Sequence, residues 1–171
     1  MTCYSGYKIY FLLTAVLLGS LSCTQQGGSS PNELPKDLLG IRVGMPKAEA
    51  QKRLEEIGSL EQDLQKKQQV WKLKDDTHFV NVAVQYNAED RIRYITAFVD
   101  KNPKARIRFT EVGDISKAKP EIVEPHYRYI WEVPAADGVP AYQVVLYGDQ
   151  KDFVSFYTLV ELGAPAKEEA G

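Results

Sequence analysis

Two histidines are the side chains best suited to acid–base or metal chemistry. His78 follows Asp75 and Asp76, so an imidazole and two carboxylates could surround a metal ion. The rival interpretation, a polar turn between two strands, is favoured because a metal site needs several ligands at set spacing. His126 stands beside Tyr127 without a partner motif, and no HExxH, nucleophile-elbow, phosphate-loop or dinucleotide pattern occurs. We therefore predict a protein that is not an enzyme, with no catalytic residue, no metal site and no cofactor; an active site assembled from distant residues is the alternative.

Six cations lie within eighteen residues: Arg91, Arg93, Lys101, Lys104, Arg106 and Arg108. Such a group could attract anions or lipid head groups. We favour a solvated sheet face, since charges at alternate strand positions also discourage edge pairing. The whole chain has 21 basic and 23 acidic residues, a net charge of −2, so we predict no nucleic-acid partner.

Aromatic side chains are the stronger functional indication. The C-terminal part of the chain holds a group of them: Tyr127, Tyr129, Trp131, Tyr142, Phe153 and Tyr157. Burying one aromatic side chain removes about 150–250 Å² from water, so we expect most of them in the core. Any that points outward would be a binding anchor, because tyrosine and tryptophan dominate interface hot spots. The sequence leaves the partner-binding residues and the binding face unknown.

The first residues have the pattern of an export signal. Residues 9–21 are uncharged over thirteen positions, follow Lys8 and lead into small residues, which predicts a signal peptide over residues 1–22. A helix of this length reaches only about 20 Å, short of the roughly 30 Å hydrocarbon core. An uncleaved membrane anchor is the alternative, and it would place the polar run after Cys23 inside lipid.

Cys23, at the end of this apolar segment, resembles the lipobox cysteine of bacterial lipoproteins. The resemblance implies cleavage before Cys23 and lipid attachment to its thiol. Ser20 departs from the pattern, which has a branched apolar residue three places before the cysteine. Plain secretion and a disulfide between Cys3 and Cys23 are the alternatives. We expect a bacterial envelope protein, periplasm-facing or extracellular, held at a membrane through Cys23.

The 171 residues are 44% hydrophobic and 26% charged, an ordinary globular composition. Residues 23–37 are rich in Gly, Ser, Pro and Gln and predict a flexible tether. Residues 163–171 are small and charged, which predicts a disordered tail. Two folded units, 38–111 and 112–162, are expected between them.

A helix is predicted over residues 44–57, because Ala50, Leu54 and Ile57 form one apolar face and Gly58 suits the position after its end. A second short helix over 59–64 is less well supported. Period-two alternation predicts antiparallel strands over 70–74, 78–86, 91–99, 129–133, 141–147 and 152–162.

The strand pattern recurs along the chain. Trp71 and Trp131 stand 60 residues apart, and Tyr86 and Tyr147 stand 61 apart. This spacing favours a duplicated unit. The predicted fold class is α+β, with tandem helix-plus-three-stranded antiparallel sheet units after the N-terminal signal segment.

The phrase I-x-V-G-M-P-K-A-E-A over residues 41–50, followed by a three-stranded meander, resembles the SmpA/OmlA (BamE-type) lipoprotein domain. That domain is also similar to each half of the tandem β-lactamase inhibitor proteins. Pro46 and Ala50 depart from the family pattern, which has Ser or Thr and Val there. The resemblance implies a noncatalytic envelope scaffold that binds proteins across its sheet.

We therefore expect an exported, lipid-anchored envelope protein that acts as a noncatalytic protein-binding or scaffold module. Its partners would be a membrane, through Cys23, and an envelope protein of unknown identity. The alternative is a secreted inhibitor or a small-ligand-binding protein that uses an aromatic sheet face.

Overall fold

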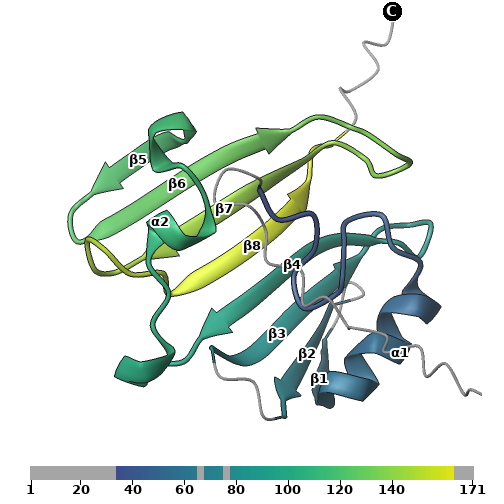
Figure 1. Ribbon diagram of the computed structural model, residues 1–171. Helices are drawn as coiled ribbons and strands as arrows, with labels where there is room; N and C mark the ends of the chain where they lie inside the picture. The colour runs from purple at the N-terminus through teal and green to yellow at the C-terminus, as the bar shows by residue number, and fades with distance from the viewer. Residues whose placement is uncertain (1–33, 65–67, 75–77, 164–171) are drawn as a thin grey trace, which may run out of the picture.

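The computed structural model describes residues 34–64, 68–74 and 78–163, which form one antiparallel sheet with short helices on one side (Figure 1). The strand order is β1-β2-β3-β4-β8-β7-β6-β5. The strands are β1 (Gly58–Leu64), β2 (Gln68–Leu73), β3 (Phe79–Tyr86), β4 (Ile92–Val99), β5 (Lys119–Val123), β6 (His126–Val133), β7 (Tyr142–Gly148) and β8 (Phe156–Glu161). The helical segments are α1 (Lys47–Ile57), η1 (Pro103–Ala105), α2 (Phe109–Val112) and η2 (Ile115–Lys117).

The sheet consists of two four-stranded meanders, β1–β4 and β5–β8, joined through their last strands. Thr96 lies opposite Thr158, and Phe98 lies opposite Phe156. The register is symmetric about the threonine pair, whose hydroxyls are hydrogen-bonded at 2.8 Å. The two halves are thus related by an approximate two-fold axis through the centre of the sheet, and residues 100–118 connect them.

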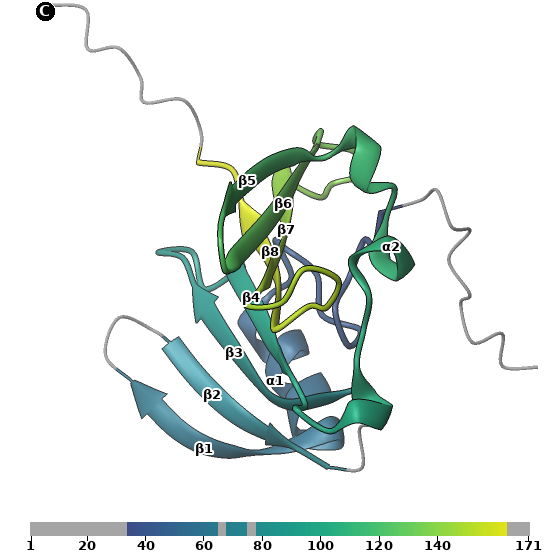
Figure 2. The ribbon, with the colours of Figure 1, turned by 90° about the vertical axis from the view of Figure 1, so that its left-hand side faces the viewer.

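All helical segments and the chain from residue 34 to 46 lie on the same side of the sheet, which we call the covered face (Figure 2). Alternate side chains of neighbouring strands pack there into one core: Trp71, Val82, Val84, Ile95, Ala97, Trp131, Val144, Leu146, Tyr157 and Leu159. The covering segments add Leu38, Ile41, Val43, Met45, Ala50, Leu54 and Phe109. This layer protects one side of the sheet from water, and among residues 34–64, 68–74 and 78–163 no second layer covers the other side.

The helix α1 forms because its apolar residues recur one turn apart. Ala50 and Leu54 are both buried against the sheet. The side chain of Arg53 donates a hydrogen bond from Nε to the Leu39 carbonyl at 3.0 Å, which ties the helix to the preceding turn. Gly58 ends the helix with extended backbone, and a Cβ there would lie 2.6 Å from the Lys72 carbonyl oxygen. The chain can therefore pass straight from α1 into β1.

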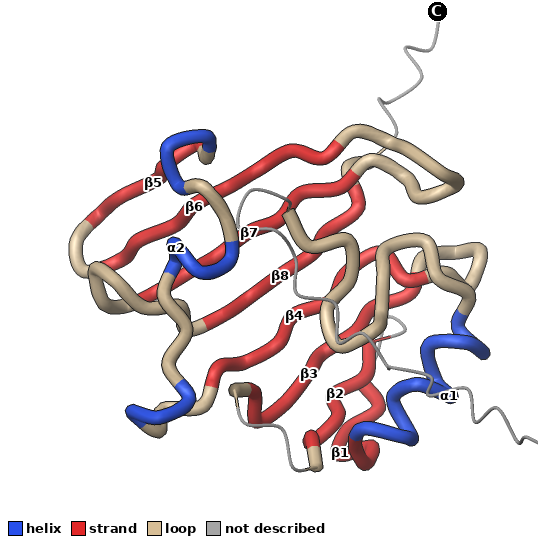
Figure 3. Tube along the Cα trace, viewed as in Figure 1, coloured by secondary structure: helices blue, strands red, loops and turns tan. Residues whose placement is uncertain are grey.

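The prediction of an α+β fold with tandem helix-plus-three-stranded, BamE-like units is wrong. The described chain is mainly β, and α1 is its only helix of seven residues or more (Figure 3). The second unit expected over residues 112–162 has only the short turn η2 before its strands, since α2 ends at Val112, and Pro120 lies within strand β5. The helical part of the supposed repeat therefore occurs once.

The expected short helix over residues 59–64 is also wrong, because this segment is strand β1. Leu60 and Leu64 have helical spacing, but pairing with β2 from Gly58 to Leu64 determines the structure instead. The six predicted strands correspond to β2, β3, β4, β6, β7 and β8 with shifted ends, and residues 152–155 precede β8 rather than belonging to it. The predicted signal peptide, Cys23, most of the tether and most of the tail lie outside the described residues.

The two tryptophans occupy corresponding places in the halves. Trp71 in β2 lies opposite Val82, and Trp131 in β6 lies opposite Val144. Both are buried. Their surroundings differ, since Trp131 donates from Nε1 to the carbonyl of Asp114 at 3.2 Å, whereas Trp71 Nε1 has no hydrogen-bond partner in the described part of the chain.

Replacement by phenylalanine should have opposite effects on the free energy of unfolding at two core tyrosines. The Tyr86 hydroxyl donates to Gln69 Oε1 at 3.2 Å, whereas the buried Tyr157 hydroxyl has no partner among the described residues. Removing an unsatisfied buried hydroxyl relieves its desolvation penalty, so we expect Tyr157→Phe to raise the free energy of unfolding by about 1 kcal/mol. Tyr86→Phe leaves the buried Gln69 Oε1 without its hydrogen-bond donor and should lower the free energy of unfolding by about 1–2 kcal/mol. Urea unfolding measures both, and a Tyr157→Phe loss equal to that of Tyr86→Phe would contradict the assignment.

The same tyrosines give the fold a stability that declines in alkali. Burial, with a smaller contribution from the Asp63 carboxylate, raises the pKa of Tyr86 from 10.0 to about 12. Burial also raises the pKa of Tyr157. Between pH 10 and about 12 the folded protein therefore retains a proton on Tyr86 that the unfolded chain loses, so stability falls as pH rises. The Tyr86→Phe variant should show a shallower decline over this range in urea unfolding measured at successive pH values.

Candidate protein-binding face

The face of the sheet opposite the helices, here called the open face, has no helix over it in the residues that the structure describes (Figure 2). Its residues follow from the register, because directly paired residues of neighbouring strands share a face. Thr96 and Thr158 mark its centre, and Ala83, Val145 and Ile130 lie on it in the flanking strands. The close approach of neighbouring side chains buries these five residues even without a covering layer.

An aromatic ladder crosses the open face over four adjacent strands. It consists of Phe98 in β4, Phe156 in β8, Tyr147 in β7 and His126 in β6. Successive ring centroids are 5.4, 5.1 and 5.7 Å apart. The Tyr147 hydroxyl and His126 Nδ1 are hydrogen-bonded at the end of the row. Phe156, in the middle, has 39% of its surface exposed, which makes it an apolar side chain held out to solvent by a rigid sheet.

The orientation of the rings limits what the ladder can bind. Tyr147 and Phe156 stack with an interplanar angle of 13°, and His126 stacks on Tyr147 at 27°. Stacked rings cover each other's faces and present their edges to solvent. A sugar or a nucleic-acid base needs a free ring face for stacking. Phe98 meets Phe156 edge-on at 75°, so it is the stacked part of the ladder, His126, Tyr147 and Phe156, that is better suited to the aliphatic and aromatic side chains of another protein.

Charged residues lie toward the margin of the open face rather than at its centre. Near the β5 edge, Arg128 and Glu121 form an ion pair at 2.9 Å, and Lys119 lies 3.6 Å from the same carboxylate. The strands β4 and β8 present Tyr94, Thr96, Phe98, Phe156, Thr158 and Val160 on this face, none of them charged. The ladder lies at one end of these strands, and Arg128 in β6 is directly opposite Tyr147. An uncharged patch with aromatic residues and charges beside it is a usual composition of protein–protein interfaces.

The aromatic residues singled out in the sequence lie on the other side of the sheet. Trp131, Tyr142 and Tyr157 are buried in the core of the covered face, as the core interpretation predicted. Tyr129 packs edge-on against Phe109 with centroids 4.9 Å apart. In the loop before β8, Phe153 lies beneath two guanidinium groups. The aromatics that face solvent are thus a different set, and sequence analysis missed the ladder.

The signal that could have revealed the ladder is the alternation within β4. Tyr94, Thr96 and Phe98 share one face, while Ile95 and Ala97 share the other. Alternation alone also places Ile95 and Ala97 on the same side as Arg91 and Arg93, which would be the outward side; the structure instead buries Ile95 and Ala97 completely. A register shift where β4 begins lets Ile92 enter the core while Arg93 stays exposed.

The six cations singled out in the sequence do not share one strand face, because Arg93 in β4 is the only one of them that lies within a strand. Arg91 donates from Nη1 to the Gly44 carbonyl at 2.9 Å, which fixes the turn before α1. Arg106 and Arg108 lie over the Phe153 ring, with centroid distances of 4.9 and 5.5 Å. These contacts hold loops in place, which differs from the solvated strand face that we expected for these cations.

The two histidines lie far apart in the fold and in different surroundings. His78 Nδ1 is 3.1 Å from the Ala105 carbonyl oxygen, and Asp75 and Asp76 lie outside the described residues. His126 belongs to the aromatic ladder. In the described segments, no three His, Cys, Asp or Glu residues are placed so that they could hold a metal ion.

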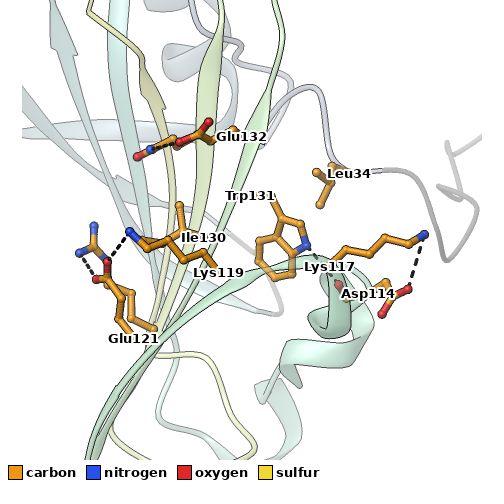
Figure 4. Close-up of a pocket in the computed structure, with 10 residues that line it drawn as sticks. Leu34, Asp114, Lys117, Lys119, Glu121, Ile130, Trp131 and Glu132 are labelled. Carbon is orange, nitrogen blue, oxygen red and sulfur yellow. Dashed lines mark hydrogen bonds and ion pairs between the residues drawn. The ribbon is translucent and has the colours of Figure 1, made fainter.

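A cleft of about 630 Å³ opens beside the start of β5 (Figure 4). Its charged side chains are already paired, since Lys117 lies 3.5 Å from Asp114, and Arg128 and Lys119 share Glu121. Hydrogen bonds from the Ser116 hydroxyl and backbone hold the pKa of Asp114 below its usual value. An ionised carboxylate at this position accepts hydrogen bonds and pairs with a cation, as Asp114 does here, so the cleft is a polar groove.

Comparisons with protein-family models, with curated proteins and with solved structures return no match for this chain. Over the described residues, no helix combines the length and the apolar composition needed to cross a membrane.

Proposed function

We propose that this protein is a noncatalytic binding module of the bacterial envelope and that it docks a partner protein on the open face of its sheet. The observation that supports this proposal is the aromatic ladder, which a rigid eight-stranded sheet presents on its uncovered side. Leaving Phe156 in water costs the protein hydrophobic free energy that a partner would recover by covering it.

Export and lipid attachment remain part of the proposal, on the grounds of the leader over residues 1–22 and of Cys23. The first described residue, Leu34, lies on the covered side, where it packs near Gly113 and against the core. The chain therefore enters the folded body on the side away from the ladder. The ten residues between Cys23 and Leu34, as a flexible chain, would average about 17 Å end to end, so the open face would be free to meet a partner while the other side faces the anchor.

The ring orientation argues against the small-ligand alternative. Because Tyr147 is stacked on both of its faces, a planar ligand has no platform there. A secreted inhibitor would use the same surface as a scaffold would, since both functions require docking onto a protein.

Site-specific photocrosslinking in intact cells tests the docking face. A benzophenone amino acid at position 156 should give a discrete crosslinked species, whereas the same group at the exposed position Glu49 on α1 should not. Adding Phe98→Asp places a charge beside Phe156 and should abolish the crosslink while the circular dichroism spectrum stays unchanged. Equal crosslinking from both positions, or a crosslink that survives Phe98→Asp, would refute the proposal. Lipid attachment has a separate test. In the same cells, Cys23→Ser should move the protein from the membrane to the soluble fraction, and unchanged fractionation would contradict an anchor at Cys23.

A further inference from the structure

The two outer strands of the sheet differ as edges. In β5, Pro120 has no backbone N–H to offer a further strand, and Lys119 adds a charge beside it. Prolines and lysines are the usual means by which edge strands resist pairing with other chains. The β5 edge is therefore blocked.

The β1 edge has none of these devices. Its seven residues include no proline and no lysine, and every residue after Gly58 is exposed. Leu60 and Leu64 have 47% and 43% of their surfaces in solvent. A bulge between Leu60 and Gln62 is the only irregularity in its pairing with β2. An edge without proline or lysine that exposes two leucines is a template for one more strand.

The pairing with β2 indicates which β1 amides are available. The Lys74 N–H donates to the Ile57 carbonyl at 2.9 Å, and in antiparallel strands the residues that face the neighbour alternate. Beyond the bulge, Gln62 and Leu64 face β2, in register with Val70 and Gln68. Asp63, between them, therefore directs its N–H and carbonyl away from the sheet.

Charge selects the occupant of this edge. The strand β1 carries two carboxylates, Glu61 and Asp63, and no cation. Antiparallel pairing with β1 of a second copy would bring carboxylates together, which is destabilising. Pairing with β5 of a second copy would meet Pro120. A second copy is thus a poor occupant on both counts.

We propose that the β1 edge takes up, by strand addition, an extended segment of a partner protein that carries lysine or arginine among aliphatic residues. The added strand would hydrogen-bond to the outward amide of Asp63, pair its cations with Glu61 and Asp63, and cover Leu60 and Leu64. This edge is separate from the aromatic ladder, so the two surfaces can bind independently.

Binding of a labelled synthetic peptide to the full chain tests the proposal. The probe is an extended peptide of about ten residues made of lysine, valine and threonine, and its control has glutamate in place of every lysine. Fluorescence anisotropy should show the lysine peptide bound about tenfold or more tightly than the control. Equal affinities, or no binding of either peptide, would overturn the proposal.

Two variants locate the binding at β1. Asp63→Pro removes the outward N–H and one carboxylate and should weaken the lysine peptide about tenfold or more. Ile122→Pro makes the matching change on the β5 edge, already blocked by Pro120, and should leave the affinity unchanged. Unchanged binding to Asp63→Pro, or equal losses in both variants, would refute the assignment to β1.

A charge-reversal variant tests the same proposal in case the Asp63→Pro variant does not fold. Glu61→Lys combined with Asp63→Lys should transfer the preference to the glutamate peptide. A retained preference for lysine would refute the proposal. Phe156→Lys, on the open face, should leave peptide affinity unchanged, so that failure at the edge and failure at the ladder can be told apart.

Discussion

Replacing Gly148 with alanine should destabilise the protein by about 3 kcal/mol, or prevent folding. Gly148 ends β7, and a Cβ there would lie 2.1 Å from the Phe153 carbonyl oxygen and 2.8 Å from Phe109 Cζ. The turn cannot move aside, because the next residues, Val154 and Ser155, are bonded through their N–H groups to the carbonyls of Ile107 and Tyr147. The clash is therefore with fixed backbone. The midpoint of urea unfolding measures the loss.

The matched control is Gly163→Ala. A Cβ at Gly163 would have no heavy atom within 4 Å, and its backbone does not require a positive φ. We expect a change in unfolding free energy within about 0.5 kcal/mol. If Gly148→Ala were equally mild, the close approach between the end of β7 and the Phe153 loop would be wrong.

The second large effect is expected at Leu159 and bears on which side of the sheet is covered. Leu159 in β8 is fully buried on the covered face, so Leu159→Ala should cost about 2–5 kcal/mol. The next residue, Val160, points to the open face and is half-buried, and Val160→Ala should cost about 1 kcal/mol or less. Thermal and urea unfolding of both variants measure the contrast. Equal losses would mean that the open face is packed, and the proposed docking site would be lost with it.

Local pattern determined much of the fold. The spacing of Ala50 and Leu54 correctly predicted α1, and Gly58 correctly predicted its end. Alternation in residues 78–86 predicted β3 and put Val80, Val82, Val84 and Tyr86 on one face. The structure buries the last three of these, whereas Val80, at a register shift near the start of β3, is 42% exposed. These elements have one buried side, so burial leaves a periodic trace in the sequence.

The edge strands could not be predicted in this way. In β1 every residue after Gly58 is exposed, and in β5 all five residues are exposed. A strand with both faces in water shows no alternation of apolar and polar residues in its sequence. Only the hydrogen bonds of β1 to β2 and of β5 to β6 make these segments strands. Without β1 and β5 the sequence suggested three-stranded units, and with residues 59–64 taken as helix it suggested too much helix.

The candidate site escaped sequence analysis for a related reason. Residues of the ladder come from β4, β8, β7 and β6, and the contact of Phe98 with Phe156 depends on pairing between strands 58 residues apart. Both faces of β4 are largely apolar, so alternation separates Ile95 and Ala97 from Tyr94 and Phe98 without saying which pair meets the helices. That choice is made by α1 and the chain before it, which pack on one side only.

The symmetric contact between β4 and β8 also has a thermodynamic consequence. Because the register is symmetric about Thr96 and Thr158, the central seam of the sheet is a contact between two bodies that only residues 100–118 keep on one chain. A covalent connection of this kind gives its ends an effective concentration on the order of millimolar. Cutting the connection between residues 100 and 118 would make pairing of β4 with β8 a bimolecular equilibrium. The melting temperature of the whole sheet would then depend on the protein concentration.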